Sequence, residues 1–362
     1  MKLAYITRTS VPSMAAQSVQ IASMCESFHE ILGSDFLIVS PINEENKFLN
    51  KPYVWMRLTT SREKPLFYFR FIIDALKIVK GFDADCIFTR DIGVAFIAAI
   101  LGKKSVYEMH KEPRTRFSQF IFPLIRRMKC VSFVSISQGL ADYYIHEYKI
   151  HPNRIFVAHD GVFLSKYDKL REVSKQSLRK TLELPDGKII MHTGSLYEGR
   201  GAELFEVMLK HFPDILFVQV GGIESDINKW QGYYKKFTNI LFITHVTNER
   251  LIQYQMSADM LFFPMTKNNP TWWCTSPMKL FEYLASGVPI LGSAIGSSGE
   301  VLSDDNSFII DPSSEASIIE AVNERFSDNE QALQKSNNAV SMVRQSYTWS
   351  ERSTSILNFI NK

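Results

Sequence analysis

The sequence is poor in cysteine and has no long apolar run. Only four cysteines occur in 362 residues, and no two form a Cys-x-x-Cys pair, so we expect reduced thiols rather than a metal site or a disulfide framework. The longest apolar run, IGVAFIAAILG, is shorter than the ~18 residues that a membrane-spanning helix needs. The apolar run before Arg8 is too short for a signal peptide. These absences predict a cytoplasmic chain, or one that is peripheral on the inner face of the plasma membrane.

A strong net charge is also lacking. The formal net charge is +3, which is too small to indicate a nucleic-acid partner. The charge is unevenly spread, because the first 165 residues carry an excess of Lys and Arg over Asp and Glu. Hydrophobic residues make up 45% and charged residues 22%, as in globular proteins with a large core. The length is typical of two domains.

Short β-rich runs alternate with helical patterns along the whole chain. This alternation predicts an α/β fold with two parallel, doubly wound, Rossmann-like domains that face each other across a cleft. We place the domains at 1–168 and 169–345, and we expect the helix at 346–362 to pack back on the N-terminal domain. Doubly wound sheets bind ligands at the carboxyl ends of their strands, so the site is expected there.

The segment SPMKLFEYLASGVPIL, from Ser276 to Leu291, has the features of a helix that begins at an anion site. Ser276 is a favourable N-cap, and Pro277 suits the first helical position. Lys279 then lies in the first turn, where a cation opposes the helix dipole unless an anion binds there. Glu282 lies one turn further and can accept hydrogen bonds from a diol. The alternative is an ordinary amphipathic helix on which Lys279 and Glu282 form a solvated pair.

A second segment, HTGSLYEGRGAELF, follows a predicted strand and leads into a helix. Gly194, Gly199 and Gly201 permit a tight loop near a ligand, and Arg200 lies at the helix start. A single glycine-rich loop is a weak signal. Two helix starts in one domain, each with a cation, indicate a clamp for a diphosphate.

Other polar residues also follow predicted strands. His110 ends the run KSVYEMH, where functional groups gather in doubly wound sheets. Arg90 and Asp91 follow another strand end, and we consider them for contact with a second substrate, the acceptor of a transferred group. Asp83 and Asp85 form an Asp-Ala-Asp pair, which we interpret as a turn rather than a metal site.

The range 114–129, RTRFSQFIFPLIRRMK, mixes five cations with aromatic and aliphatic side chains. Such a segment in the basic half fits an anionic membrane surface. It fits a core helix with charged ends equally well.

With these motifs together, the chain resembles a GT-B fold glycosyltransferase of glycosyltransferase family 4. SPMKLFEYLASGVPIL resembles the donor motif of that family in its Ser-Pro-x-Lys variant, and GSLYEGRGAELF resembles its phosphate loop. ADMLFFPM resembles the strand before the donor motif, HDGVFLSKYD the interdomain segment, VYEMHKEP the strand end with the family histidine, and VPSMAAQSVQIASMCESF the first loop and helix. The resemblance covers nearly the whole chain.

The resemblance implies a retaining hexosyltransferase that is independent of metal and uses no cofactor beyond a nucleoside diphosphate sugar. It implies that Arg200 and Lys279 hold the donor diphosphate, that Glu282 binds the ribose, and that His110 lies beside the transferred sugar. The residues implied in donor binding are Gly194, Ser195, Arg200, His245, Val246, Ser276, Met278, Lys279 and Glu282. The implied acceptor is a glycan or a lipid-linked hydroxyl, in bacterial surface polysaccharide or glycolipid assembly.

The sequence departs from the family pattern at Cys274, where the commoner motif has a first glutamate. A thiol does not accept hydroxyl hydrogen bonds as a carboxylate does, so Asn268, Asn269, Trp272 or Trp273 are alternatives for sugar contact. Two other functions stay open at this point. One is a GT-B enzyme of another reaction class, such as an epimerase or a phosphorylase. The other is a catalytically silent subunit that binds nucleotide sugars.

Overall fold

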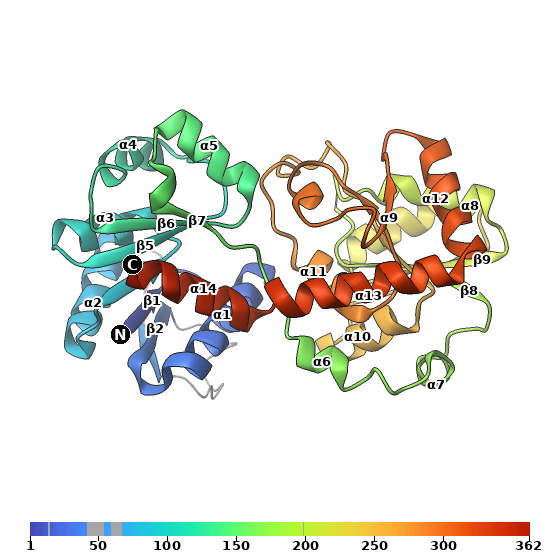
Figure 1. The fold of residues 1–362 in the computed structure, drawn as a ribbon, viewed down its shortest axis with the longest axis horizontal. Coiled ribbons are helices and arrows are strands. Elements are labelled where there is room, and N and C mark those ends of the chain that lie inside the picture. The colour runs from blue at the N-terminus through green and yellow to red at the C-terminus, as the bar shows by residue number, and fades with distance from the viewer. Residues whose placement is uncertain (14, 42–53, 59–66, 198) are drawn as a thin grey trace. The chain divides into compact units, whose positions relative to one another are not determined.

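The computed structural model describes residues 1–13, 15–41, 54–58, 67–197 and 199–362. The chain divides into two compact units. The first unit contains Met1–Asp160 together with Trp349–Lys362, and the second contains Gly161–Thr348 (Figure 1). The two Rossmann-like domains predicted from the alternation of strands and helices are confirmed.

The first unit is built on a parallel sheet. Within the described residues it has seven strands in the order β3-β2-β1-β4-β5-β6-β7. The strands are β1 (Leu3–Ile6), β2 (Phe36–Pro41), β3 (Val54–Leu58), β4 (Cys86–Thr89), β5 (Lys104–Met109), β6 (Val131–Ser135) and β7 (Ile155–Val157). Every residue of β1, β2 and β4 is buried, as expected where helices cover both faces of a parallel sheet. β3 is a strand that the sequence analysis did not predict.

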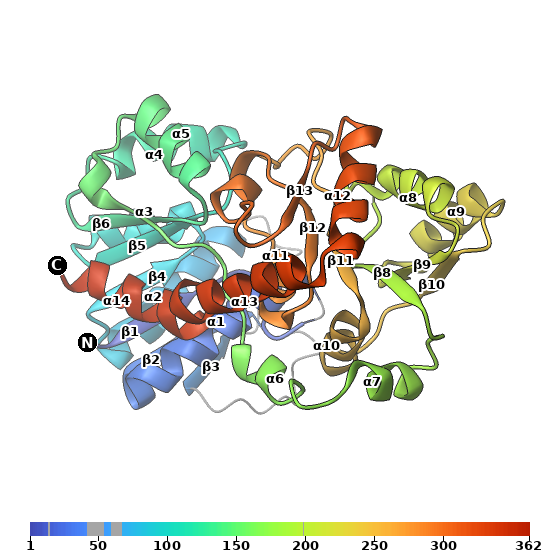
Figure 2. The same ribbon diagram turned by 45° about the vertical axis from the view of Figure 1, so that its right-hand side comes forward.

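Six α-helices of the first unit are described: α1 (Ala16–Leu32), α2 (Phe67–Phe82), α3 (Ile92–Ile100), α4 (Arg116–Ile125), α5 (Gln138–Tyr148) and α14 (Trp349–Asn361). Short 3-10 turns occupy Gly33–Asp35 and Pro152–Arg154. α14 packs beside α1, as the two views show (Figures 1 and 2). Ser27 donates a hydrogen bond to the Trp349 carbonyl at 2.9 Å, and the rings of Phe156 and Phe359 stack at 5.3 Å. The last helix of the chain is therefore part of the N-terminal unit.

The second unit has a six-stranded parallel sheet in the order β10-β9-β8-β11-β12-β13. Its strands are β8 (Lys188–Thr193), β9 (Ile215–Val220), β10 (Ile240–Ile243), β11 (Met260–Phe263), β12 (Ile290–Ser293) and β13 (Phe308–Ile310). Its α-helices are α6 (Leu164–Asp168), α7 (Lys175–Thr181), α8 (Phe205–His211), α9 (Glu224–Tyr234), α10 (Asn248–Ser257), α11 (Met278–Ser286), α12 (Glu315–Ser327) and α13 (Asn329–Ser346). Short 3-10 turns occupy Ala202–Leu204 and Gly296–Glu300.

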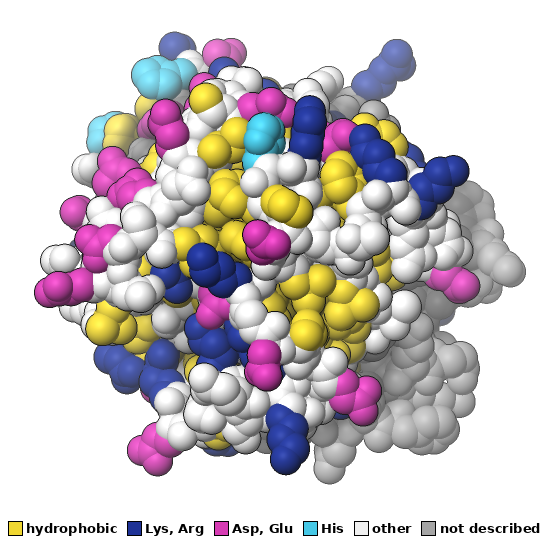
Figure 3. Space-filling view, turned by 90° about the vertical axis from the view of Figure 1, so that its right-hand side faces the viewer, with side chains coloured by type: hydrophobic (Ala, Val, Ile, Leu, Met, Phe, Trp, Pro, Cys, Tyr) yellow, Lys and Arg dark blue, Asp and Glu magenta, His cyan; other side chains and the backbone are white. Residues whose placement is uncertain are grey.

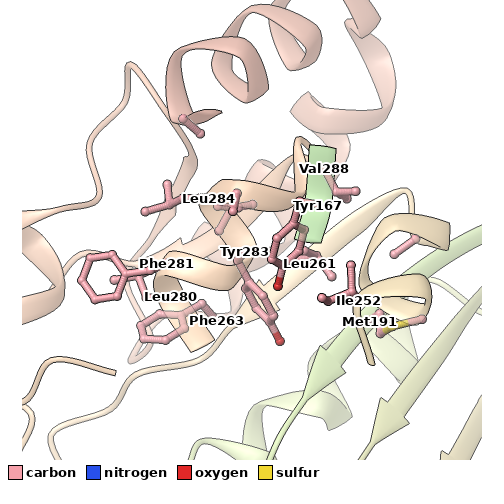
Figure 4. Packing of buried hydrophobic residues seen from close by; sticks show 14 of the residues in the cluster. Tyr167, Met191, Ile252, Leu261, Phe263, Leu280, Phe281, Tyr283, Leu284 and Val288 are labelled. Atoms are coloured by element: carbon pink, nitrogen blue, oxygen red, sulfur yellow. The ribbon is translucent and has the colours of Figure 1, made fainter. Parts of the chain in front are cut away.

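The core of the second unit holds α11 between the sheet and the helices around it. Leu280, Phe281, Tyr283 and Leu284 of α11 are fully buried, and they pack with side chains of β8, β11, α6 and α10 (Figure 4). α6 belongs to this cluster through Tyr167. The chain therefore enters the second unit at residue 161, a few residues before the predicted boundary at 168, and leaves it at 348 rather than 345.

Charged side chains of both signs share the face of the molecule that Figure 3 shows, with apolar patches between them. The cysteines carry no disulfide: Cys25, Cys86 and Cys274 are buried and Cys130 is half-buried. No helix within the described ranges is both long enough and apolar enough to cross a membrane.

Candidate active site

The second unit has a pocket at the point where its strand order reverses. The chain forms β8 in the middle of the sheet and later returns to add β11 on the other side of β8. Ligands of doubly wound sheets bind at the carboxyl ends of such a strand pair. The pocket lies at this place, and it is lined by Gly199, Arg200, Phe263, Pro264, Met265, Asn269, Pro277 and Lys279.

The loop after β8 forms one side of the pocket because its glycines permit a close approach. Gly194 has a φ of 114°, and a side chain there would meet Lys279 Nζ at 3.8 Å. Gly201 has a φ of 79°, and a Cβ at this position would lie 2.0 Å from the carbonyl oxygen of Pro264. Only glycine fits such a position. Ser195 is half-buried in the same loop.

The α11 helix begins one residue later than the sequence predicted. Its N-cap is Pro277, whose side chain makes no capping hydrogen bond, and its first helical residue is Met278. Ser276, which the sequence predicts as the cap, lies one residue before this N-cap, and its side chain is buried. The N–H groups of a helix's first turn have no partner within the helix, which is the arrangement that binds anions.

Lys279 stands in this first turn and is held by a histidine. Its Nζ lies 2.8 Å from Nε2 of His192, the penultimate residue of β8. Burial and the charge of nearby Arg200 lower the pKa of Lys279 to about 7, although Glu282 opposes this shift. A bound anion would restore the charge, so the lysine is suited to a phosphate.

Arg200 also lines the pocket. Its guanidinium lies over the Tyr197 ring at 4.5 Å and donates a hydrogen bond to the Tyr197 hydroxyl. Its Nε is buried and has no hydrogen-bond partner among the described residues. Arginine is suited to phosphate because its planar fork donates several hydrogen bonds.

Glu282 lies one turn beyond Lys279, and its carboxylate accepts a hydrogen bond from Gln255 Nε2 at 3.1 Å. Gln255 is in turn fixed, because its Oε1 accepts a hydrogen bond from the Tyr167 hydroxyl at 2.8 Å. Burial raises the pKa of Glu282, whereas the hydrogen bond from Gln255 and the charge of Lys279 lower it. Tyr283 binds the backbone N–H of Thr193 at 2.7 Å, which ties α11 to the end of β8.

His245 and Val246 lie in the loop between β10 and α10. His245 is exposed, and Val246 packs partly against the core. Neither residue lines the pocket. Asn269, which the sequence analysis offered as a substitute for the missing glutamate, does line it. Cys274 is fully buried and does not line the pocket.

The first unit carries a second polar cluster around Glu108 of β5, which is fully buried. Its carboxylate accepts from Arg90 Nε at 2.5 Å, from Arg352 Nη2 at 2.7 Å and from His110 Nε2 at 3.0 Å. Burial alone would raise the pKa of Glu108, but Arg90 and Arg352 outweigh it and hold the pKa well below the usual value. Glu108 is therefore a carboxylate with three donors around it.

This cluster determines the hydrogen-bonding state of His110. Because Glu108 is ionised and only accepts, His110 Nε2 must carry a proton. Burial and Arg90 lower the pKa of His110, although Glu108 opposes the shift, so the ring is neutral near pH 7. Its Nδ1 is then an acceptor, available to a hydroxyl group.

Arg90 and Asp91, which we considered for acceptor contact, take part in the framework. Arg90 is buried between Glu108 and Gln20. Asp91 caps α3 by accepting from Gly93 N at 3.0 Å, and it also accepts from the Tyr68 hydroxyl at 2.7 Å. Both side chains therefore make framework contacts, and Arg90 Nη2 is buried without a hydrogen-bond partner among the described residues.

Several residues of the two clusters were not found by sequence reasoning. They are His192, Gln219 and Gln255 in the second unit, and Gln20, Glu108 and Arg352 in the first. A polar residue inside an apolar strand was the available signal for His192 and Glu108, since such residues are buried only with partners. Within the described residues, no group of three or more His, Cys, Asp and Glu side chains is placed to hold a metal ion. Asp83 has a φ of 59°, and Asp85 accepts a hydrogen bond from the Lys2 N–H at 2.8 Å.

Comparison with known proteins links both units to one enzyme class. Residues 17–166 match the model of Glycosyltransferase Family 4, and residues 174–342 match the model of Glycosyl transferases group 1. No curated protein matches the chain.

Solved structures with low sequence identity share the fold. A glycosyltransferase from Rickettsia africae ESF-5 has a TM-score of 0.83 and 15% identity, with 99% of this chain and 97% of that one covered. Anabaena HepE in complex with UDP has a TM-score of 0.78 and 13% identity over 100% of both chains. Sucrose-phosphate synthase from Thermosynechococcus elongatus has a TM-score of 0.77 and 15% identity, with 99% and 98% covered. At these identities the structures show a common fold, that of two Rossmann-like domains.

Proposed function

Because the chain is a glycosyltransferase with the GT-B fold and of the family 4 type, we propose that it transfers a hexose from a nucleoside diphosphate sugar to a hydroxyl group. We further propose that the anomeric configuration is retained. Retention rests on the resemblance of the donor motif and of the phosphate loop to that family.

Donor binding is proposed for the pocket of the second unit. Lys279, Arg200 and the N–H groups at the start of α11 would bind the diphosphate. Glu282, half-buried one turn further, would accept hydrogen bonds from the ribose diol. A bound UDP in HepE, which shares this fold, supports a nucleotide as the ligand class. The observation that carries the proposal is the half-buried Lys279, placed in the first turn of α11 and lining one pocket with Arg200.

These groups also fit the chemistry of sugar transfer. The bond between the anomeric carbon and the diphosphate oxygen breaks, so negative charge grows on the leaving group. Positioned cations and amides stabilise such charge best when they are already in place before the reaction. We propose that the acceptor proton passes to the leaving phosphate oxygen, and we assign no side chain as general base.

His110 is proposed to contact the transferred sugar. Its Nδ1 is an acceptor at the end of β5, and the Glu108–Arg90–Arg352 cluster fixes its ring. A hydroxyl group of the sugar can donate a hydrogen bond to this nitrogen. The role follows from the resemblance, and the fixed tautomer supports it.

Metal-independent transfer is proposed because Arg200 and Lys279 supply the positive charge that a divalent ion supplies in other enzymes. Transfer should therefore continue in excess EDTA. Loss of activity that added manganese or magnesium restores would contradict this proposal.

A glycan or lipid-linked acceptor at an anionic membrane is proposed for the first unit. Helix α4 buries Ile121, Phe122 and Ile125, while its other face exposes Phe117, Phe120 and Leu124. Arg114, Arg116, Arg127 and Lys129, within α4 or close to its ends in the sequence, are exposed as well. Exposed apolar groups among cations suit an anionic lipid surface. The setting in bacterial surface polysaccharide or glycolipid assembly rests on the resemblance alone.

The decisive experiment is a binding screen followed by a transfer assay. UDP, GDP, ADP and their sugar conjugates are tested with the full chain by thermal shift, since a ligand that binds the folded state raises its stability. The expected result is a shift with one nucleoside diphosphate and its sugar, and release of that diphosphate when an acceptor extract is added. Absence of any shift at millimolar concentrations would contradict donor binding. Binding without transfer to any acceptor would favour a silent subunit.

A further inference from the structure

Three side chains from three neighbouring elements form a hydrogen-bonded series that includes Lys279. Gln219 of β9, His192 of β8 and Lys279 of α11 follow one another by hydrogen bonds. His192 Nδ1 lies 2.5 Å from Gln219 Oε1, and His192 Nε2 lies 2.8 Å from Lys279 Nζ. His192 and Gln219 are fully buried. The function proposed above uses neither of them.

Two backbone carbonyl groups determine which atoms donate and which accept in this hydrogen-bonded series. Gln219 Nε2 donates to the carbonyl oxygens of Gly194 at 2.9 Å and of Gly221 at 3.1 Å. These two acceptors orient the amide so that its Oε1 faces the imidazole. An amide oxygen only accepts, so His192 Nδ1 must carry the proton. His192 Nε2 then has a lone pair and accepts a hydrogen bond from Lys279.

His192 remains neutral in this position. Burial and the adjacent Lys279 hold the pKa of His192 well below its usual value, and Arg200 acts in the same direction. The hydrogen bond to Gln219 opposes these effects without reversing them. The imidazole is therefore a neutral acceptor beside Lys279, which lines the pocket.

We propose that His192, oriented by Gln219, is a positioning residue that holds the Lys279 amino group in the diphosphate site. This inference rests on the function proposed above, because it assumes that Lys279 meets the donor diphosphate. Without His192, a long flexible side chain would have to be ordered by the ligand itself, which weakens binding. The same oriented Gln219 also holds the Gly194 carbonyl, so one side chain ties the glycine loop and the lysine together.

The arrangement has a consequence for protons. Three groups face Lys279: Arg200 from the loop after β8, His192 from β8, and Glu282 from its own helix. In the unliganded protein burial and Arg200 lower the pKa of Lys279 to about 7. A bound diphosphate raises that pKa, so the lysine takes up a proton from solvent when the ligand binds above pH 7. Affinity should therefore fall as the pH rises from 7 to 9, by at most about tenfold per pH unit.

The test compares two variants that both fill the space of the imidazole. His192→Gln places an amide oxygen near the position of Nε2 and keeps an acceptor, whereas His192→Leu removes it. Binding of UDP, GDP and ADP to the full chain is measured by titration calorimetry, and circular dichroism melting confirms that each variant folds. His192→Leu should weaken binding by roughly 10- to 100-fold, the loss expected for a hydrogen bond to a charged group, and His192→Gln should restore most of it.

A second measurement follows the protonation of Lys279, which a change in packing alone would not alter. Calorimetry in two buffers of different ionisation enthalpy counts the protons taken up, which should approach about one per site at pH 8 in the parent. Lys279→Arg is the matched control, since arginine stays charged and should bind with no proton uptake and no pH dependence between 7 and 9.

The outcomes distinguish a failure of the positioning role of His192 from a failure of the proposed donor site. A parent chain that binds none of the three nucleotides removes the donor site, and the role of His192 with it. If the parent binds but His192→Leu and His192→Gln bind equally well or equally poorly, the donor site stands and the positioning role of His192 is overturned. Proton uptake that persists in Lys279→Arg would overturn the assignment of the proton to Lys279.

Discussion

Arg352 Nη2 donates a hydrogen bond to Glu108 Oε1 at 2.7 Å, although 244 residues separate them in the sequence. Glu108 is on β5, and Arg352 is on the last helix, α14. The guanidinium also donates to the His159 carbonyl at 2.7 Å, so it joins three separate parts of the first unit. Both side chains are almost fully buried, with exposed fractions of 2% and 0%.

Replacing this arginine should strongly destabilise the protein. Arg352→Met leaves a buried carboxylate with fewer donors, and breaking a buried pair in this way costs about 3–5 kcal/mol of unfolding free energy. Urea denaturation measures the loss. Arg344→Met is the matched control on the neighbouring helix, because the Arg344–Asp168 pair is largely exposed, and it should cost less than about 1 kcal/mol. Equal losses in the two variants would show that burial of the pair does not matter.

Lys279→Ala and Arg200→Ala should each remove about 2–4 kcal/mol of transition-state stabilisation. Both cations act on one diphosphate, so the double variant should lose less than the sum. The measurements are binding of the nucleoside diphosphate and single-turnover transfer rates. Lys210→Ala, an exposed site on α8, serves as the control. If Lys279→Ala binds and turns over like the parent, the lysine is merely a helix residue and the donor site is misplaced.

Glu282→Gln should stabilise the unliganded protein at neutral pH. Burial raises the pKa of Glu282, so the folded state holds its proton to a higher pH than the unfolded state does. Stability is then lost as the pH rises from about 4.5 through the folded pKa, because a buried carboxylate must ionise. The Glu282→Gln variant has no carboxylate to ionise and keeps its stability as the pH rises. The difference in stability between variant and parent should therefore disappear near pH 4.

Thermal melts of parent and variant between pH 4 and 8 test this expectation, with Glu320→Gln on the exposed side of α12 as the control. The same Glu282→Gln variant should discriminate less between ribose and deoxyribose nucleotides. A stability difference that grows toward acid pH would contradict the argument.

His110→Ala should abolish transfer and leave nucleoside diphosphate binding largely unchanged, since His110 belongs to the first unit and the diphosphate groups to the second. His146→Ala, an exposed site on α5, is the control in the same unit. Transfer rates and calorimetric binding are measured for both. A folded His110→Ala variant with full activity would exclude the histidine from the reaction.

The exposed side of α4 should mediate binding to anionic vesicles. The protein should sediment with vesicles of phosphatidylglycerol and phosphatidylcholine at low salt and be released at high salt, because salt screens charge attraction beyond about 10 Å at 0.1 M. Phe120→Ser should weaken the association several-fold, since Phe120 is 70% exposed in the centre of that side. Leu333→Ser is the control, because Leu333 is 62% exposed on α13 of the other unit. Equal binding to neutral vesicles would contradict a role for charge.

Most of the sheet could be predicted because its strands are short apolar runs bounded by turns. β3 escaped prediction, because VWMRL places an arginine within a short and mixed run. The start of α11 was misplaced by one residue, since both Ser276 and Pro277 suit a helix N-terminus and local preference does not choose between them.

The partners of the site residues were harder to predict than the residues themselves. Lys279 stands out because a cation in the first turn of a helix is unusual, whereas Arg200 stands out by its place between two glycines; it lies in the loop before α8, which begins at Phe205, and not at the helix start that the sequence predicts. The contacts of Lys279 with His192 and of Glu108 with Arg352 join distant parts of the sequence, and nothing in the local pattern of either partner identifies the other. Such pairs appear only when the sheet order and the return of α14 are known.

The return of α14 to the first unit also has a consequence during protein synthesis. A ribosome that adds ~5–20 residues per second must complete all of Gly161–Thr348 before Arg352 emerges, a delay of roughly 10–40 s. During that interval the nascent N-terminal sheet exposes the surface of α1 that α14 later covers, and Glu108 lacks one of its cations. The first unit is thus translated first but completed last, and a chaperone that shields the bare α1 surface would act in this interval.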